Sequence, residues 1–224
     1  MAAADERARI NIYNEEGGID VLLTILESYT KRCQHETQDL DSDPDLHLVG
    51  TDLGGSDGSN EDVLIKTVRV VANLCLAERA GRGLAATHAE RAVKALLACL
   101  QLAEIPVDDQ WLSAEELARA MERREELATA ALAALNNITF YREPPAPPDP
   151  RAELTDDICK AACRWLGGRG AASCEAVRAL GNVSRAPRAA QVIVLEGALD
   201  GLLPFLEHED GAVRCAAAGV LVNV

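Results

Sequence analysis

The sequence predicts an all-α fold in which similar helical units stack into a superhelix, an α-solenoid. Three observations predict it. Residues 16–28 align without gaps with residues 196–208, seven of the thirteen positions are identical, and an offset of 180 residues equals about four units of the ~40–47 residues typical of helical repeats. An apolar helical stretch with an Asn near its end recurs four times. Hydrophobic residues make up 48% of the chain but aromatic residues only 3%, which suits packing of Leu, Ala and Val between neighbouring repeats.

The recurring stretches set the period of the repeat. Their asparagines are Asn73, Asn137, Asn182 and Asn223, so the spacings are 64, 45 and 41 residues. The last two spacings fit one unit and the first is too long. Counted to the Asn from a leucine in the preceding helix (Leu26, Leu100, Leu166 and Leu206), the four units span 47, 37, 16 and 17 residues. Two insertions, 29–60 and 102–126, therefore fall at the same junction of two successive units.

The two insertions differ in composition. Residues 29–60 contain six aspartates with Gly and Ser between them, and low hydrophobicity with one-sided charge predicts a disordered acidic loop. Residues 102–126 contain Ser113-Ala114-Glu115-Glu116, a capping-box pattern followed by an apolar run. This pattern predicts that the insertion is partly helical and that the helix carrying Asn137 begins near Ala114.

A proline-rich connector, residues 143–151, interrupts the following unit. Its density of proline is incompatible with a helix interior and favours an extended chain, which we expect to replace the short first helix of this unit. The repeat resumes at Thr155, so residues 1–224 are expected to form a single repeat domain. The last repeat stops just past Asn223 without a polar capping helix. We therefore expect an incomplete C-terminal repeat, in a fragment of a longer protein or with a partner covering that end.

Charge and cysteine content exclude several classes of protein. The formal net charge is −14, from 22 basic and 36 acidic residues, whereas binding to nucleic acid by phosphate neutralisation needs the opposite sign. No stretch approaches the ~18 apolar residues of a membrane span, and the N-terminus lacks a signal core. Seven cysteines without a secretory signal predict free thiols in a reducing compartment. We expect a cytoplasmic protein that binds neither nucleic acid nor membrane.

No residue pattern indicates catalysis or a cofactor. The four histidines are scattered, and no Gly-rich phosphate loop follows a strand. Cys159 and Cys163 lie one helical turn apart, but a zinc site needs further ligands close to them. We expect no enzyme activity, no cofactor and no bound metal, because activity is argued from a site and none is visible.

A leucine-rich helix followed by a helix that ends in apolar-x-Asn-apolar-small resembles the armadillo repeat. The resemblance covers residues 16–224 and is carried by Ala72-Asn73-Leu74, Asn136-Asn137-Ile138, Gly181-Asn182-Val183 and Val222-Asn223-Val224. It implies a right-handed superhelix whose third helices line a concave surface. In that family the Asn side chains of this surface hydrogen-bond the backbone of an extended partner.

Two interpretations of the recurring Asn remain open. Asn is unfavourable inside a helix unless its amide has a use, and its donor and acceptor together suit the peptide group of a partner. Alternatively, each Asn braces the next turn between repeats. On the first interpretation the protein-binding residues of the concave face are Asn73, Asn137, Asn182 and Asn223, together with Arg69 and Arg178.

The two arginines suggest the charge of the partner. Where armadillo proteins of the nuclear-import type carry Trp, one turn before the Asn, this chain has Arg69, Ala133, Arg178 and Gly219. Residues four apart share a helix face, so we expect local positive charge in the groove. This favours an acidic protein partner, bound as an extended or helical segment, over a Lys/Arg-rich one. Alternatively, the arginines pair with carboxylates of neighbouring repeats.

These observations predict a non-enzymatic adaptor or scaffold. The segments around Asn73, Asn137 and Asn182 also resemble a family member associated with assembly of cilia and sperm flagella. That resemblance implies an adaptor of the cytoplasm and the axoneme. The alternative is a general cytoplasmic scaffold, unrelated to cilia, that binds its partners through the inserted segments 29–60 and 102–126.

Overall fold

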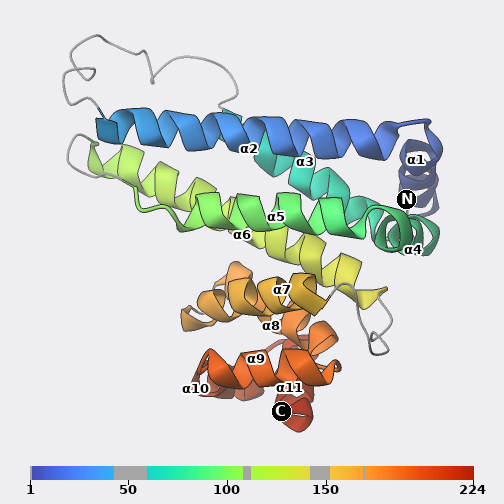
Figure 1. Ribbon diagram of the computed structural model, residues 1–224, viewed down its shortest axis with the longest axis vertical. Coiled ribbons are helices and arrows are strands. Elements are labelled where there is room, and N and C mark those ends of the chain that lie inside the picture. The colour runs from blue at the N-terminus through green and yellow to red at the C-terminus, as the bar shows by residue number, and fades with distance from the viewer. Residues whose placement is uncertain (1, 43–59, 108–111, 142–151, 169) are drawn as a thin grey trace.

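The computed structural model describes residues 2–42, 60–107, 112–141, 152–168 and 170–224, and every regular element in these ranges is a helix. The all-α prediction is therefore confirmed. The helices, labelled in Figure 1, are α1 (Ala2–Asn14), α2 (Gly18–Ser42), α3 (Asn60–Leu74), α4 (Glu78–Thr87), α5 (Ala89–Glu104), α6 (Ala114–Phe140), α7 (Ala152–Arg164), η2 (Trp165–Gly167), α8 (Ala171–Val183), α9 (Pro187–Leu195), α10 (Leu199–Leu202), η3 (Leu203–Glu207) and α11 (Gly211–Asn223).

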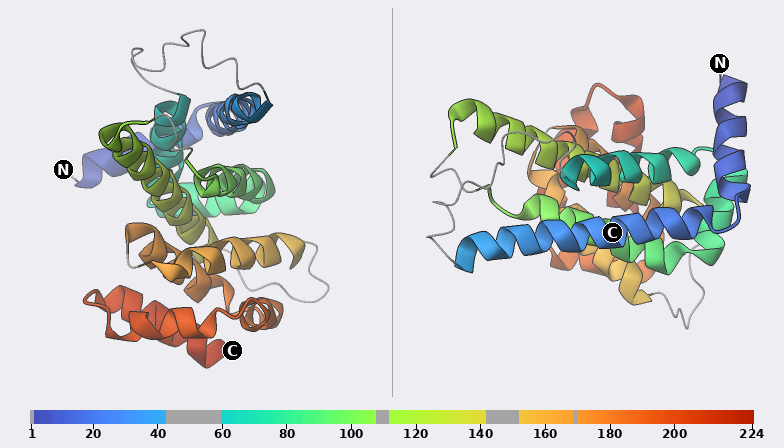
Figure 2. Two further views of the ribbon diagram at one scale, coloured as in Figure 1. Left: turned by 90° about the vertical axis from the view of Figure 1, so that its left-hand side faces the viewer. Right: turned by 90° about the horizontal axis from the view of Figure 1, so that it is seen from above.

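The helices pack in two rows along the long axis of the molecule (Figure 1). In one row α3 packs on α6, α6 on α8, and α8 on α11. In the other row α2 packs on α5, α5 on α7, and α7 on α9. A side view shows the units following one another from α1–α3 at one end to α9–α11 at the other (Figure 2). Stacking in which each unit contacts its neighbours defines an α-solenoid.

Most units contain a short first helix, a second helix and a third helix. This order is α4, α5, α6 in one unit and α9, α10 with η3, α11 in the last. The first helix α1 lies across the end of α2 (Figure 2). The next unit after α6 consists of α7, the short 3-10 helix η2 and α8, and the proline-rich connector 143–151 that precedes it lies outside the described residues.

Two glycines explain part of the internal repeat. Gly17 and Gly197 have positive φ angles of 73° and 67°, which side chains other than glycine rarely adopt. Each follows a first helix and turns the chain into the second. At the later copy the Gly197 N–H donates to the Val194 carbonyl (3.0 Å) and the Ala198 N–H donates to the Ile193 carbonyl (3.2 Å). These bonds satisfy carbonyl groups that the end of α9 leaves without a donor.

The two copies of the repeat bury different leucines. Leu23 of α2 is fully buried, whereas its counterpart Leu203 is 52% exposed. Pro204 follows it, and proline supplies no N–H for an α-helical hydrogen bond. The chain therefore forms the short α10 and then the 3-10 helix η3, and this change of winding turns Leu202 and Phe205 towards the core instead.

The acidic insertion was predicted to be a disordered loop over residues 29–60, and for residues 29–42 this is wrong. Helix α2 continues to Ser42. For residues 29–33 the cause is tertiary packing, since Thr30 and Cys33 are buried and the Thr30 Oγ1 lies 3.6 Å from the Cys99 Sγ of α5. Helix α3 begins at Asn60, and residues 43–59 lie outside the described part of the chain.

The start of α6 was predicted correctly by the capping box. The Glu116 N–H donates to the Ser113 Oγ (3.3 Å), and the Ser113 N–H donates to the Glu116 carboxylate (2.8 Å). Arg124, in the added turns of α6, lies 3.3 Å from the Glu61 carboxylate of α3 and also donates to the Leu102 carbonyl of α5. These contacts attach the N-terminal half of α6 to both neighbouring helices.

Among the described helices, none taken alone is both long and apolar enough to cross a membrane. Helix α9 and the segment Leu199–Glu207 are long and apolar enough for a membrane span only when they are taken together. The chain bends by 99° between them.

Candidate protein-binding face of the third-position helices

The recurring asparagines lie near the C-terminal ends of α3, α6, α8 and α11, which we call the third-position helices. Three of these side chains reach the preceding helix of the row. The Asn137 Nδ2 donates to the Ala72 carbonyl (3.0 Å), and the Asn182 Nδ2 donates to the Asn136 carbonyl (2.9 Å). The Asn223 Nδ2 donates to the Ser184 Oγ (3.0 Å). The bracing interpretation therefore holds for Asn137, Asn182 and Asn223.

The first asparagine of the row differs from the others. Asn73 in α3 is exposed, and within the described ranges its side chain has no hydrogen-bond partner. Helix α3 is the first third-position helix of the described row. Asn73 keeps both a donor and an acceptor available.

The bracing bonds fix which end of each amide faces outward. Backbone carbonyl oxygens only accept hydrogen bonds, so the atoms nearest the Ala72 and Asn136 carbonyls must be the amide nitrogens of Asn137 and Asn182. Their carboxamide oxygens have no partner among the residues that the structure describes. The row therefore offers an oxygen acceptor at each of these two positions.

The arginines of this face are both paired, as the second interpretation of them predicted. Arg69 lies 2.5 Å from the Glu126 carboxylate of α6, and their side chains are 56% and 36% exposed. Arg178 lies 2.5 Å from both Glu175 and Asp210, the N-terminal cap of α11. Exposed pairs of this kind contribute only about 0–1 kcal/mol, so Arg69 can exchange its partner at small cost.

A groove of about 590 Å³ separates α3 from α6 on this face. Its wall on α3 contains Arg69, Ala72 and Asn73, and its wall on α6 contains Glu122, Glu125, Glu126, Thr129, Ala130 and Ala133. Three carboxylates thus face one guanidinium, which gives a formal charge of −2 (1 minus 3) for the groove. The local positive charge expected from Arg69 alone is outweighed by glutamates of the neighbouring unit.

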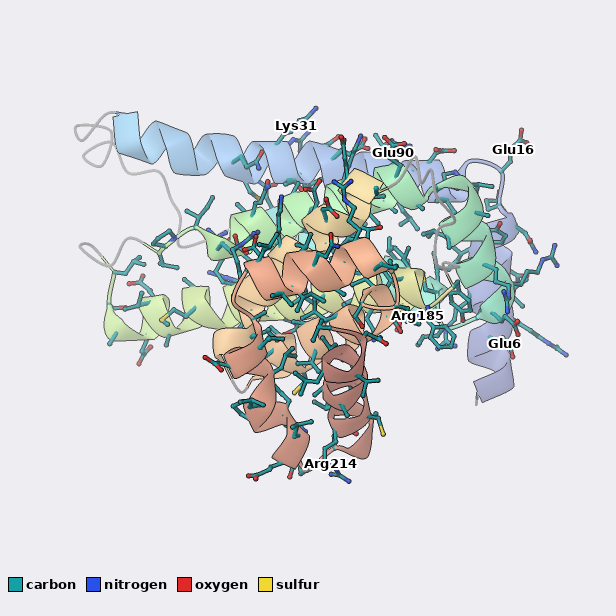
Figure 3. The ribbon with its side chains drawn as sticks, turned by 60° about the horizontal axis from the view of Figure 1, so that its bottom comes forward. Glu6, Glu16, Lys31, Glu90, Arg185 and Arg214 are labelled. Atoms are coloured by element: carbon teal, nitrogen blue, oxygen red, sulfur yellow. The ribbon has the colours of Figure 1, made fainter. Side chains whose placement is uncertain are left out.

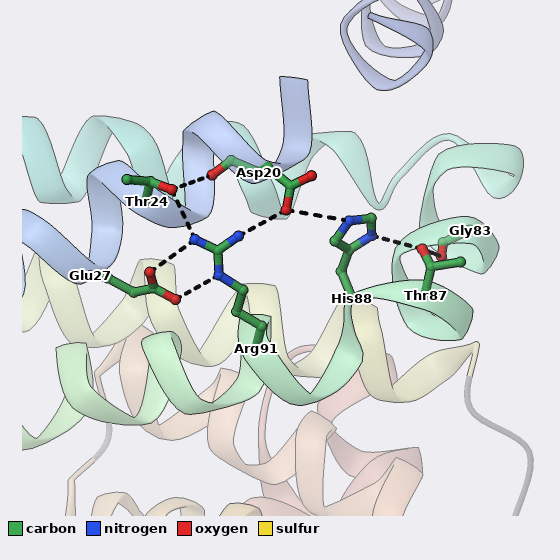
Figure 4. Close-up of polar contacts among 7 residues, drawn as sticks. All are labelled: Asp20, Thr24, Glu27, Gly83, Thr87, His88 and Arg91. Atoms are coloured by element: carbon green, nitrogen blue, oxygen red, sulfur yellow. Dashed lines mark hydrogen bonds and ion pairs between the residues drawn. The ribbon is translucent and has the colours of Figure 1, made fainter. Parts of the chain in front are cut away.

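The helices of the other row, α2, α5, α7 and α9, carry a different set of polar contacts. Arg91 of α5 binds the Glu27 carboxylate of α2 through its Nε (2.7 Å) and Nη2 (2.9 Å), and its Nη1 binds Asp20 (2.8 Å) (Figure 4). The hydrogen bonds from Arg91 hold the pKa of Glu27 below its usual value. The His88 Nε2 lies 3.8 Å from the same Asp20.

Similar ion pairs join the later units on that side. Arg164 of α7 lies 2.9 Å from Glu104 of α5, and Arg188 of α9 lies 2.6 Å from Asp156 of α7. These ion pairs could not be predicted from the sequence, because the two partners of a pair lie between 32 and 71 residues apart along the chain. Other charged side chains of this surface, such as Lys31 and Glu90, project outward (Figure 3).

Four of the seven thiols are buried. All seven cysteines are free, and burial raises the pKa of Cys75 and of Cys163 to about 12. No group of three or more His, Cys, Asp or Glu side chains in the searched ranges could hold a metal ion.

One cysteine lies beside a histidine. The Cys174 Sγ is 3.4 Å from the His208 Nε2, while the His208 Nδ1 accepts from the Asp210 N–H (3.0 Å). In the neutral ring the proton is therefore on Nε2, facing the sulfur, where it cannot remove the thiol proton. Burial also raises the pKa of Cys174. This geometry does not activate a nucleophile.

The stacked helical units define an α-solenoid repeat protein. Along its whole length the chain is similar to armadillo repeat-containing protein 2, with 25% identity to the mouse protein and 24% to the human protein. It spans 23% of the length of these relatives.

No family model matches the sequence. The chain also aligns with the crystal structure of an engineered protein, over 98% of this chain and 96% of that one, with 19% identity and a TM-score of 0.40. That score is too low to indicate a shared fold.

Proposed function

We propose that the chain is a non-enzymatic adaptor that binds partner proteins on the face of its third-position helices, between α3 and α8. The observation that carries this proposal is the groove between α3 and α6, whose walls combine Asn73, Thr129 and three glutamates with small alanines. Small side chains let a partner backbone approach closely, and the polar groups offer it hydrogen bonds. A scaffold role is in keeping with the repeat class.

The proposal is tested by filling the groove without disturbing the bracing bonds. Ala133 lines the groove and is only partly buried, so Ala133→Phe should obstruct a partner. The matched control is Ala86→Phe, at an exposed position of α4 outside the groove. Proteins that co-purify from ciliated cells are quantified by mass spectrometry. We expect Ala133→Phe to lose the partners that the control retains, and equal retention by both variants would move the site elsewhere.

The second candidate binding element is the acidic segment between α2 and α3. Residues 43–59 carry four aspartates and no lysine or arginine, and such one-sided charge is typical of interaction segments. Replacing residues 44–58 with a Gly-Ser linker should leave the partners unchanged if the groove binds them. Loss of partners with retained helicity, measured by circular dichroism, would instead favour this segment.

We also propose a cytoplasmic location that includes the cilium or the flagellar axoneme. The support is the resemblance of the segments around Asn73, Asn137 and Asn182 to a family member associated with those organelles. Comparing the partners captured from ciliated and non-ciliated cells tests this proposal. Identical sets of partners in the two cell types would count for the general cytoplasmic scaffold.

A further inference from the structure

We infer that the groove between α3 and α6 selects a cationic, extended segment of a partner protein, with its lysine or arginine side chains bound by Glu122 and Glu126. This inference rests on the proposed protein-binding function of the same face. It reverses the acidic partner expected from Arg69 and Arg178, because the fold places the Glu126 carboxylate beside Arg69 and the Glu175 and Asp210 carboxylates beside Arg178.

The first support is the direction of the hydrogen bonds. Asn137 and Asn182 lie on the same row of helices, outside the lining of the groove. Each donates an amide N–H to a carbonyl group of the chain itself and keeps its oxygen as an acceptor. Ammonium, guanidinium and backbone N–H groups are the partner groups that such acceptors bind.

The second support is that not every carboxylate in the groove already has an ion-pair or hydrogen-bond partner. Glu122 is exposed and has no partner in the part of the chain that the structure describes. Glu125 accepts a hydrogen bond from the Ala172 N–H (3.3 Å) through its Oε1. Glu126 is paired with Arg69. One carboxylate is therefore free for a cation, and a second is held by a single arginine.

Arg69 then acts as a competitor for the partner and not as its ligand. Its side chain is more than half exposed, and ion pairs in contact with water are weak. A cation of the partner replaces the Arg69 guanidinium at Glu126, and Arg69 turns to solvent. The two hypotheses about the partner consequently predict opposite effects of removing Arg69.

The test uses a fluorescein-labelled decapeptide of alternating Ala and Lys, and a matched peptide of alternating Ala and Glu, in fluorescence anisotropy titrations at about 50 mM salt. We expect the Lys peptide to bind and the Glu peptide not to bind. Glu122→Gln should weaken the Lys peptide about two- to fivefold, and Arg69→Ala should strengthen it by a similar factor, as befits exposed charge pairs.

The control variant is Glu207→Gln. Glu207 lies on η3 in the last unit, is exposed, and has no partner among the described residues, so it matches Glu122 in charge change and exposure. Equal weakening by Glu122→Gln and Glu207→Gln would show general attraction to an acidic protein and overturn the inference. Weaker binding of the Lys peptide to Arg69→Ala, or preference for the Glu peptide, would also overturn it.

The outcome separates this inference from the proposed function. If the groove binds an acidic segment, Ala133→Phe still blocks binding of the Glu peptide while Arg69→Ala weakens it, so the function stands and the charge assignment fails. If neither peptide responds to Ala133→Phe, the groove is not the binding site and both proposals fail.

Discussion

The amide of Asn137 supplies a donor that α3 cannot supply for itself. The last carbonyl groups of a helix lack intrahelical donors, and the Ala72 carbonyl, close to the end of α3, receives the Asn137 Nδ2 instead. This use of the amide explains why Asn is present inside α6 despite its low helix propensity. The same residue joins two units through its nitrogen, and its oxygen has no hydrogen-bond partner among the described residues.

Removing the brace should cost stability where the amide is bonded and almost none where it is free. We expect Asn137→Ala to lower the free energy of unfolding by about 1–2 kcal/mol, because it leaves the Ala72 carbonyl without its donor. Asn73→Ala is the matched control, with an expected change within about 0.5 kcal/mol. Urea unfolding followed by circular dichroism measures both. A similar loss for the two variants would contradict the bracing role.

At the scale of the helical element, local signals and tertiary contacts determine different boundaries. The glycine turns at Gly17 and Gly197 are local, since a positive φ follows from the residue type. The continuation of α2 past Ser28 is accompanied by packing of Thr30 against α5. The 3-10 winding of η3 follows from Pro204 at its beginning.

Replacing glycine by alanine should change the free energy of unfolding in opposite directions in a turn and in a helix. Gly197→Ala should lower the free energy of unfolding by about 1 kcal/mol, because alanine is strained at a φ of 67°. Gly219→Ala should raise it by up to about 1 kcal/mol, because Gly219 lies in helix α11 with nothing within 4 Å of an added Cβ. Thermal unfolding of both variants checks the signs. Stabilisation by Gly197→Ala would show that the turn does not need glycine.

For the whole molecule, the repeat could be predicted from the sequence because it recurs at a regular spacing. The internal repeat indicated the stacked units, and Ser113 and Glu116 located the start of α6. The polar character of the binding face could not be predicted in the same way. It depends on which carboxylates of the next unit meet Arg69 and Arg178, and on which end of each Asn amide faces the preceding helix.

The groove between α3 and α6 carries a charge of the same sign as the whole molecule. A net charge of −14 attracts cationic partners from a distance, while the groove between α3 and α6 concentrates carboxylates at one place. The ion pairs of Arg91, Arg164 and Arg188 join helices of the other row. None of these residues lines the groove between α3 and α6.

The central claim, that partners bind on the third-position helices, is tested most directly by NMR of the isotope-labelled chain during titration with the Lys peptide. The side-chain amide signals of Asn73 and Asn137 and the backbone signal of Thr129 should shift together and saturate at one dissociation constant, because all three residues border the face. Shifts confined to residues 43–59, or to the outer ion pairs around Arg91, would contradict the account.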